Sequence, residues 1–140
     1  MNPFTSNDLN GLRILLADDE IFIRQMGRDV LAMLGCIPTV AADGWQAWEL
    51  FRQDPTYFDV IISDYSMPEM NGIDLATKVF SMRENMPFIM STGLGSGFND
   101  KKAKDLGISC MLPKPYVIEQ LKDAILSALA KTAAIQQKGF

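Results

Sequence analysis

Five polar side chains stand directly after short apolar segments, at Asp18, Asp19, Asp64, Thr92 and Lys114. If they meet in the fold, three carboxylates, a hydroxyl and an ammonium group share one place. Two unit charges 4 Å apart repel by roughly 4 kcal/mol at an effective dielectric constant of about 20. Such a cluster therefore requires a neutralising cation or a protonated acid. Lys114 supplies one positive charge, and we expect Mg²⁺ to supply the rest, because all-oxygen ligands favour Mg²⁺ over zinc.

The elements that must position these side chains alternate along the chain. Short apolar segments predict strands at residues 13–17, 37–41, 58–63, 87–91 and 108–112. Apolar residues at helical spacing predict helices at residues 23–34, 44–53, 72–83, 99–106 and 117–131. Five strand–helix units on short connections indicate an α/β fold, a parallel sheet with helices on both faces. Ligands of such sheets bind beyond the carboxyl ends of the strands, where the five polar side chains are expected to converge.

The chain length suits one domain. A chain of 140 residues can bury one core, and it contains no repeat, low-complexity stretch or linker that would divide it. We predict a polar N-terminal tail at residues 1–10, a single domain at 11–132 and a polar C-terminal tail at 133–140.

Composition excludes several classes of function. The chain has no histidine, which removes histidine bases, histidine metal ligands and a phosphohistidine on this chain itself. Cys36 and Cys110 are too few for a structural zinc site or a disulfide framework. The formal net charge of -4 argues against a nucleic-acid partner. The longest apolar run, residues 30–34, cannot span a membrane, and the N-terminus does not have the pattern of a signal peptide, so a cytoplasmic protein is expected.

Four motifs carry a family resemblance. They are residues 15–20 (LLADDE), 64–72 (DYSMPEMNG), 91–93 (STG) and 114–115 (KP). In this order, each at the end of a predicted strand, they resemble the receiver domain of two-component response regulators. The stretch 64–72 is the most specific, and the resemblance covers roughly residues 11–132. It implies a flavodoxin-like (CheY-like) three-layer sandwich, with a five-stranded parallel sheet of order 2-1-3-4-5 and five helices.

The resemblance also implies roles for the acidic residues. Asp64 would be the phosphoryl acceptor, and a carboxylate is a nucleophile that needs no separate base. Asp19 and Asp64 would bind Mg²⁺ directly, together with the backbone carbonyl of Ser66, while Asp18 would act through water. No further cofactor is implied.

The remaining site residues concern the phosphoryl group and the switch. By resemblance, Lys114 would bind the phosphoryl oxygens, through a Lys114–Pro115 bond that is usually cis in the family, and Thr92 would place its hydroxyl on the new phosphoryl group. Gly72 is expected to supply backbone freedom at a turn. The family often has Tyr, Phe or His three residues before the lysine, where this chain has Met111. Methionine has no ring or hydroxyl, which leaves open how Thr92 is coupled to the rest of the domain.

The resulting prediction is a signalling switch and not an enzyme, apart from self-phosphotransfer and autodephosphorylation. The phosphodonor would be a histidine kinase or a histidine phosphotransfer protein, because this chain has no histidine. Phosphorylation would change binding to a downstream protein, or to a second copy of the chain, through the fourth helix, fifth strand and fifth helix. A stand-alone regulator and a receiver from a hybrid histidine kinase both remain open.

Three alternative functions fit the sequence less well. A phosphatase of the haloacid dehalogenase type also uses an aspartyl-phosphate, but needs an acid two residues after the nucleophile, where Ser66 stands. The glycines at residues 93–97 lack the spacing of a dinucleotide-binding motif and the Lys-Ser/Thr of a phosphate-binding loop. A receiver used as a binding module without phosphorylation conflicts with the intact acids, Thr92 and Lys114, although Met111 keeps it open.

Overall fold

The chain forms one α/β sandwich in the computed structural model, which describes residues 9–93 and 95–138, with side chains up to residue 132. Five parallel strands pair in the order β2-β1-β3-β4-β5, as predicted. The strands are β1 (Arg13–Ala17), β2 (Ile37–Ala41), β3 (Val60–Asp64), β4 (Phe88–Thr92) and β5 (Cys110–Pro113). The helices are α1 (Ile21–Met33), α2 (Gly44–Gln53), α3 (Gly72–Met82), α4 (Asp100–Leu106) and α5 (Ile118–Lys138).

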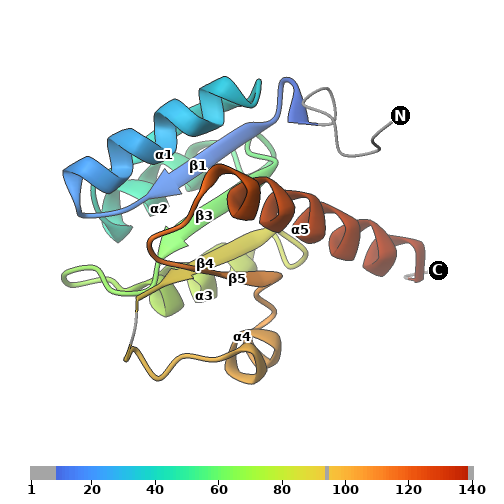
Figure 1. Ribbon diagram of the computed structural model, residues 1–140. Coiled ribbons are helices and arrows are strands. Elements are labelled where there is room, and N and C mark those ends of the chain that lie inside the picture. The colour runs from blue at the N-terminus through green and yellow to red at the C-terminus, as the bar shows by residue number, and fades with distance from the viewer. Residues whose placement is uncertain (1–8, 94, 139–140) are drawn as a thin grey trace.

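Two apolar cores lie on opposite faces of the sheet (Figure 1). Successive strand residues point to opposite faces, so Leu15 packs with α2 and α3 while its neighbour Leu16 packs with α1 and α5. Strands buried on both sides read as continuous apolar runs, and this explains the lack of polar alternation in β1, β3 and β4. The parallel direction brings the carboxyl ends of the strands to one edge of the sheet.

Side-chain caps fix where three of the helices begin. Asp43 accepts a hydrogen bond from the backbone N–H of Gln46 at 2.8 Å at the start of α2. Asn71 accepts one from Asp74 N–H at 2.9 Å, and the Asp74 carboxylate accepts from Asn71 N–H in return, which completes a capping box at α3. Asn99 begins α4 in the same way. The caps therefore fix the ends of the segments that follow β2, β3 and β4.

The structure differs from the sequence-based expectation near both ends of the chain. Leu9 is fully buried in the core beneath α1 and α5, although the N-terminal tail was expected to reach residue 10. Residues 1–8 of that tail lie outside the described residues. Helix α5 runs to Lys138, beyond the predicted end at Lys131. Residues 132–138 are rich in alanine, glutamine and lysine, which favour helix, and the first glycine after Lys131 comes only at position 139.

Among the residues that the structure describes, no helix combines the length and apolarity needed to cross a membrane.

Candidate functional site

Register of the parallel strands places the predicted site residues side by side. Asp64 is the last residue of β3 and pairs with Ser91, while Thr92 ends β4 and pairs with Pro113 of β5. Lys114 follows Pro113, and its backbone N–H donates to the Thr92 carbonyl at 2.8 Å. Asp64 and Thr92 were expected just past their strands and are instead the final strand residues. This one-residue difference leaves the convergence at the carboxyl edge intact.

Asp18, Asp19 and Asp64 form one carboxylate cluster. Each contributes a carboxylate oxygen, and these oxygens lie within 4.8 Å of one another. Asp18 and Asp64 are buried, with exposures of 2% and 6%, while Asp19 is exposed to solvent. Hard oxygen ligands in an arrangement open on one side suit Mg²⁺, which usually keeps several waters. The residues present therefore fit the ion expected from the sequence.

Lys114 lies between the two buried carboxylates. Its Nζ is 2.9 Å from Asp18 Oδ2 and 3.0 Å from Asp64 Oδ2, and Glu20 Oε1 stands farther off at 4.0 Å. Burial lowers the pKa of Lys114, but the hydrogen bonds to Asp18 and Asp64 outweigh it and raise that pKa above its usual value. The Lys114–Pro115 peptide bond is cis, as the resemblance implies. Lys114 is thus a charged ammonium held at Asp64.

The electrostatics at Asp64 oppose its ionisation. Burial raises the pKa of the Asp64 carboxyl, and the charge of Asp18 raises it further. The hydrogen bond from Lys114 and the weaker one from Ser66 N–H, at 3.4 Å, act in the opposite direction without cancelling the shift. Burial is the main cause of this shift, and in addition three carboxylates of the cluster face the single ammonium group of Lys114. Additional positive charge is therefore favourable next to Asp64.

Two contacts that hold Asp18 were not predicted. The Arg24 guanidinium of α1 donates to the Asp18 backbone carbonyl at 2.7 Å, and Glu20 N–H donates to Asp18 Oδ1 at 2.9 Å. Helical spacing alone indicates only that Arg24 lies outside the apolar face of its helix. Its contact depends on how α1 leaves β1, a feature that helical spacing does not contain.

Gly72 has a different role from the one expected. Its φ is not positive; Glu69 is the residue of this connection with a left-handed backbone, at φ 65°. A Cβ at Gly72 would lie 2.6 Å from the Asp64 carbonyl oxygen and would also overlap Met90. Gly72 N–H donates to the Tyr65 carbonyl at 2.9 Å. Glycine is therefore required for close packing of α3 against the end of β3.

The two switch positions predicted from the sequence lie on neighbouring strands. Thr92 is 8% exposed at the end of β4. Met111 pairs with Met90 across β4 and β5 and packs against the core formed with α2, α3 and α4.

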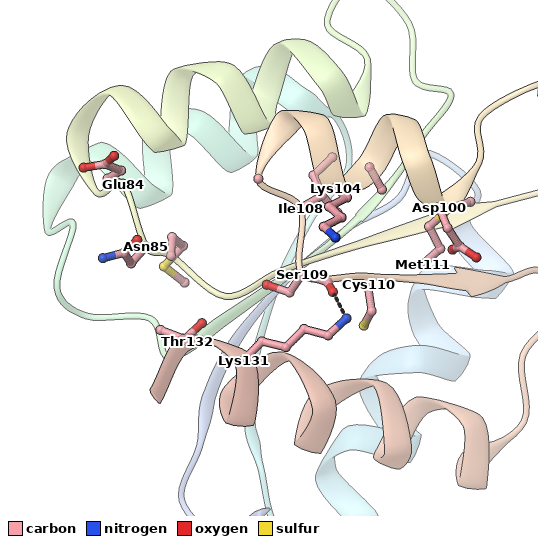
Figure 2. A pocket seen from close by; sticks show the side chains of 13 residues that line it. Glu84, Asn85, Asp100, Lys104, Ile108, Ser109, Cys110, Met111, Lys131 and Thr132 are labelled. Atoms are coloured by element: carbon pink, nitrogen blue, oxygen red, sulfur yellow. Dashed lines mark hydrogen bonds between the residues drawn. The ribbon is translucent and has the colours of Figure 1, made fainter. Parts of the chain in front are cut away.

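Met111 also lines a pocket of about 820 Å³ between α4, β5 and α5 (Figure 2). Lys104 points into the pocket from α4, while Lys131 of α5 donates from Nζ to the Ser109 carbonyl at 2.7 Å. Met86, Ala103 and Ile108 provide an apolar floor. The pocket therefore combines basic side chains with an apolar lining. Met111 belongs both to this lining and to strand β5.

The fold and the carboxylate–lysine cluster define a class of domain, the α/β domains that carry an acidic cluster at the carboxyl edge of a parallel sheet. The family description "response regulator receiver domain" matches residues 14–126. The chain belongs to the response regulator receiver domain family.

Curated relatives agree with this assignment. The chain is 32% identical over 117 residues to a probable chemotaxis protein CheY of Rhizobium etli, covering 81% of this chain and 89% of that protein. It is 29% identical over 127 residues to response regulator RppA of Synechocystis, covering 91% of this chain but only 51% of RppA. The chain therefore spans about half the length of that relative.

Solved structures show the same fold. A response regulator receiver domain protein from Clostridium thermocellum superposes with a TM-score of 0.82 at 27% identity, covering 89% of this chain and 98% of the other. Chemotaxis protein CheY4 of Vibrio cholerae gives 0.77 at 33% identity, with coverage of 85% and 99%. Receiver domains are regulatory: they take phosphoryl groups from histidine kinases, bind Mg²⁺ at an acidic pocket and act on downstream targets.

Proposed function

We propose that this chain is a phosphorylation-dependent switch whose acceptor is Asp64. The observation that carries the proposal is the position of Lys114, with Nζ 3.0 Å from Asp64 Oδ2 inside a cluster of three carboxylates. A nucleophile, a cation at hydrogen-bond distance and ligands for a divalent ion are the groups that phosphoryl transfer requires.

The proposed phosphoryl transfer takes place between a phosphohistidine of the donor and Asp64. An Asp64 carboxylate oxygen attacks phosphorus, the phosphorus–nitrogen bond of the donor breaks, and its electron pair returns to the imidazole nitrogen. The product is an aspartyl-phosphate on this chain and a histidine on the donor. Asp64 acts as the carboxylate and needs no base. Lys114 donates to the phosphoryl oxygens and offsets their charge, where most catalysis of phosphoryl transfer lies.

Asp19, Asp64 and the Ser66 carbonyl would hold Mg²⁺ directly, and Asp18 would contact it through water. When bound, the ion supplies positive charge to the transferring group. The cluster supports this assignment, because three carboxylates whose oxygens lie within 4.8 Å of one another face a single ammonium group. Glu20 N–H and Arg24 hold the Asp18 carboxylate and backbone in place.

The output would pass through the face formed by α4, β5 and α5. Thr92 would place its hydroxyl on the phosphoryl group, and the pocket beside Met111 would present a changed surface to a downstream protein or to a second copy of the chain. The basic side chains and apolar floor of this pocket support a protein partner. The phosphodonor would be a histidine kinase or a histidine phosphotransfer protein, because the chain has no histidine of its own.

Intact mass spectrometry after incubation with acetyl phosphate tests the proposal. We expect a gain of one phosphoryl group that requires Mg²⁺ and is lost in Asp64→Asn. Asp29→Asn is the matched control, because Asp29 is an exposed aspartate on α1 outside the cluster, and it should label as the wild type does. Full labelling of Asp64→Asn would contradict the assignment of the acceptor.

The second candidate is a receiver-type binding module that works without phosphorylation. Met111, at the position where the family often has an aromatic residue, is the observation in its favour. A wild-type chain that gains no phosphoryl group under any of these conditions would support this candidate.

A further inference from the structure

The segment between β4 and α4 has one apolar anchor among its described residues. Phe98 is 7% exposed, while the other described residues from 93 to 99 are exposed or partly exposed. A Cβ on Gly93, Gly95 or Gly97 would meet nothing within 4 Å, and the last two have φ near +80°. Among the described residues of this segment, Phe98 is therefore the one whose side chain is buried in the core.

The partner of that ring is Tyr65, the residue that follows Asp64. The ring centroids of Tyr65 and Phe98 are 5.0 Å apart, with planes 33° from parallel. The backbone of Tyr65 is fixed on both sides: its N–H donates to the Ser91 carbonyl at 2.8 Å, and its carbonyl accepts from Gly72. Phe98 thus packs on a side chain whose backbone is joined to the phosphoacceptor, to β4 and to α3.

We infer that the Tyr65–Phe98 contact couples the phosphoacceptor site to α4. The inference rests on the proposed function and names how the site is connected to its output. Phe98 belongs to the same buried core as Ala103 of α4, and Tyr65 packs against that core. Phe98 and Tyr65 are positioning residues, since neither reaches the reacting atoms.

Both ends of the segment are placed to respond to a phosphoryl group. Thr92 precedes it, and Phe98 lies near its end, with α4 beginning at Asp100. A phosphoryl group on Asp64 draws the Thr92 hydroxyl and lies next to Tyr65, and the glycines between allow the backbone to adjust. Asp100, Ala103 and Lys104 of α4 line the pocket (Figure 2), so a shift of Phe98 changes the shape of that pocket.

Hydrogen–deuterium exchange of the full chain, with and without acetyl phosphate and Mg²⁺, tests the inference. In the wild type we expect phosphorylation to change exchange in residues 95–106 several-fold. Phe98→Ala and Tyr65→Leu should accept the phosphoryl group as fully as the wild type, as checked by intact mass, but lose this change. Phe98→Tyr, which keeps a ring, should restore it.

Two controls separate coupling from general packing. Phe80 packs on Phe88 at the far end of α4, with centroids 5.8 Å apart, so Phe80→Leu should keep the phosphorylation-dependent change. Met111→Ala should keep it as well. A Phe98→Ala chain that is phosphorylated and still shows the full change would overturn the inference alone. A wild-type chain that gains no phosphoryl group would overturn both the proposed function and the inference. The intact mass of the chain shows whether it is phosphorylated and so distinguishes the two outcomes.

Discussion

Lys114 contacts both buried carboxylates of the site. The cluster nevertheless keeps a net negative charge, because three carboxylates face one ammonium group. Asp18 and Asp64 each lie about one hydrogen-bond length from its Nζ, and Asp19 adds a third carboxylate to the cluster. Repulsion among the acids and the loss of solvent at Asp64 both disfavour the ionised form of that carboxyl. In the absence of a divalent cation, the ionised Asp64 carboxylate therefore weakens the fold.

Asp64→Asn is expected to raise the free energy of unfolding at neutral pH, without divalent cations, by about 1 kcal/mol, the usual scale of one substitution. The folded state raises the pKa of Asp64 above its ordinary value of 3.8, so the folded protein binds that proton more tightly than the unfolded chain. Ionised Asp64 destabilises the fold above the folded-state pKa, and this penalty disappears as the pH falls through that pKa toward 3.8.

Urea unfolding in the presence of a chelator measures this effect. The gain from Asp64→Asn should be largest at neutral pH and should shrink on acidification. Asp29→Asn, on an exposed helix face, should change little at either pH. A variant Asp64→Asn that is less stable than the wild type at neutral pH would contradict the electrostatic account.

At this scale the sequence predicts residue types well and contacts poorly. Polar residues after apolar runs were enough to find Asp18, Asp64, Thr92 and Lys114, because parallel strands must end at one edge. The hydrogen bond from Arg24 to the Asp18 carbonyl was not predicted, because it depends on the path of the chain between β1 and α1. The Tyr65–Phe98 pair is separated by a whole strand and helix, and no local pattern links the two rings.

Elements meet closely where α3 begins. The start of α3 is capped by Asn71 and Asp74, and its first residue, Gly72, lies against the last residue of β3. This packing sets the path of the connection that carries Tyr65 and Ser66. The position of Asp64 thus depends on a contact between α3 and β3 that leaves no room for a side chain at residue 72.

Gly72→Ala is expected to lower the free energy of unfolding by about 1–3 kcal/mol, the usual cost of overpacking. The added methyl group would lie 2.6 Å from the Asp64 carbonyl oxygen, which is backbone and cannot rotate away. The rate of phosphoryl acceptance should also fall, because the end of β3 must move. Urea unfolding and the acetyl phosphate assay check the two effects.

Gly93→Ala is the matched control, since a Cβ there meets nothing within 4 Å. Equal stabilities for Gly72→Ala and the wild type would show that α3 can shift at no cost. The sequence identified Gly72 but assigned it conformational freedom, because a glycine beside a proline-containing turn looks the same whether the need is a positive φ or space.

In the whole molecule, the residues that form the two apolar cores are distinct from the residues of the carboxylate cluster. Two cores cover the sheet, whereas the carboxylates and Lys114 lie at one end of it, where only strand termini and loops contribute. Apolar periodicity was sufficient to predict the alternating strands and helices, and the family resemblance supplied the strand order. Periodicity failed at the ends of the chain, at Leu9 and beyond Lys131, where single apolar residues or helix-forming polar residues carry no period.

Leu121→Ala is expected to lower the free energy of unfolding by about 2–5 kcal/mol, as for other large-to-small core substitutions. Leu121 is fully buried between α5 and the sheet, away from the carboxylates. Under conditions where the variant is folded, phosphoryl acceptance from acetyl phosphate should match the wild type. Ile118→Ala, at a residue of the same helix that is 40% exposed, should change stability by less than about 1 kcal/mol. A folded Leu121→Ala chain that loses acceptance would show that core and site are not separable.

The contact between Tyr65 and Phe98 also limits how strongly phosphorylation can act through it. An aromatic pair contributes about 0.5–1.5 kcal/mol beyond its buried area, and roughly 1.4 kcal/mol corresponds to a tenfold change in an equilibrium. Complete reversal of a 1:99 population needs about 5.5 kcal/mol. Coupling through this pair alone therefore gives a graded response, in which target occupancy changes most when the target concentration lies between the two dissociation constants.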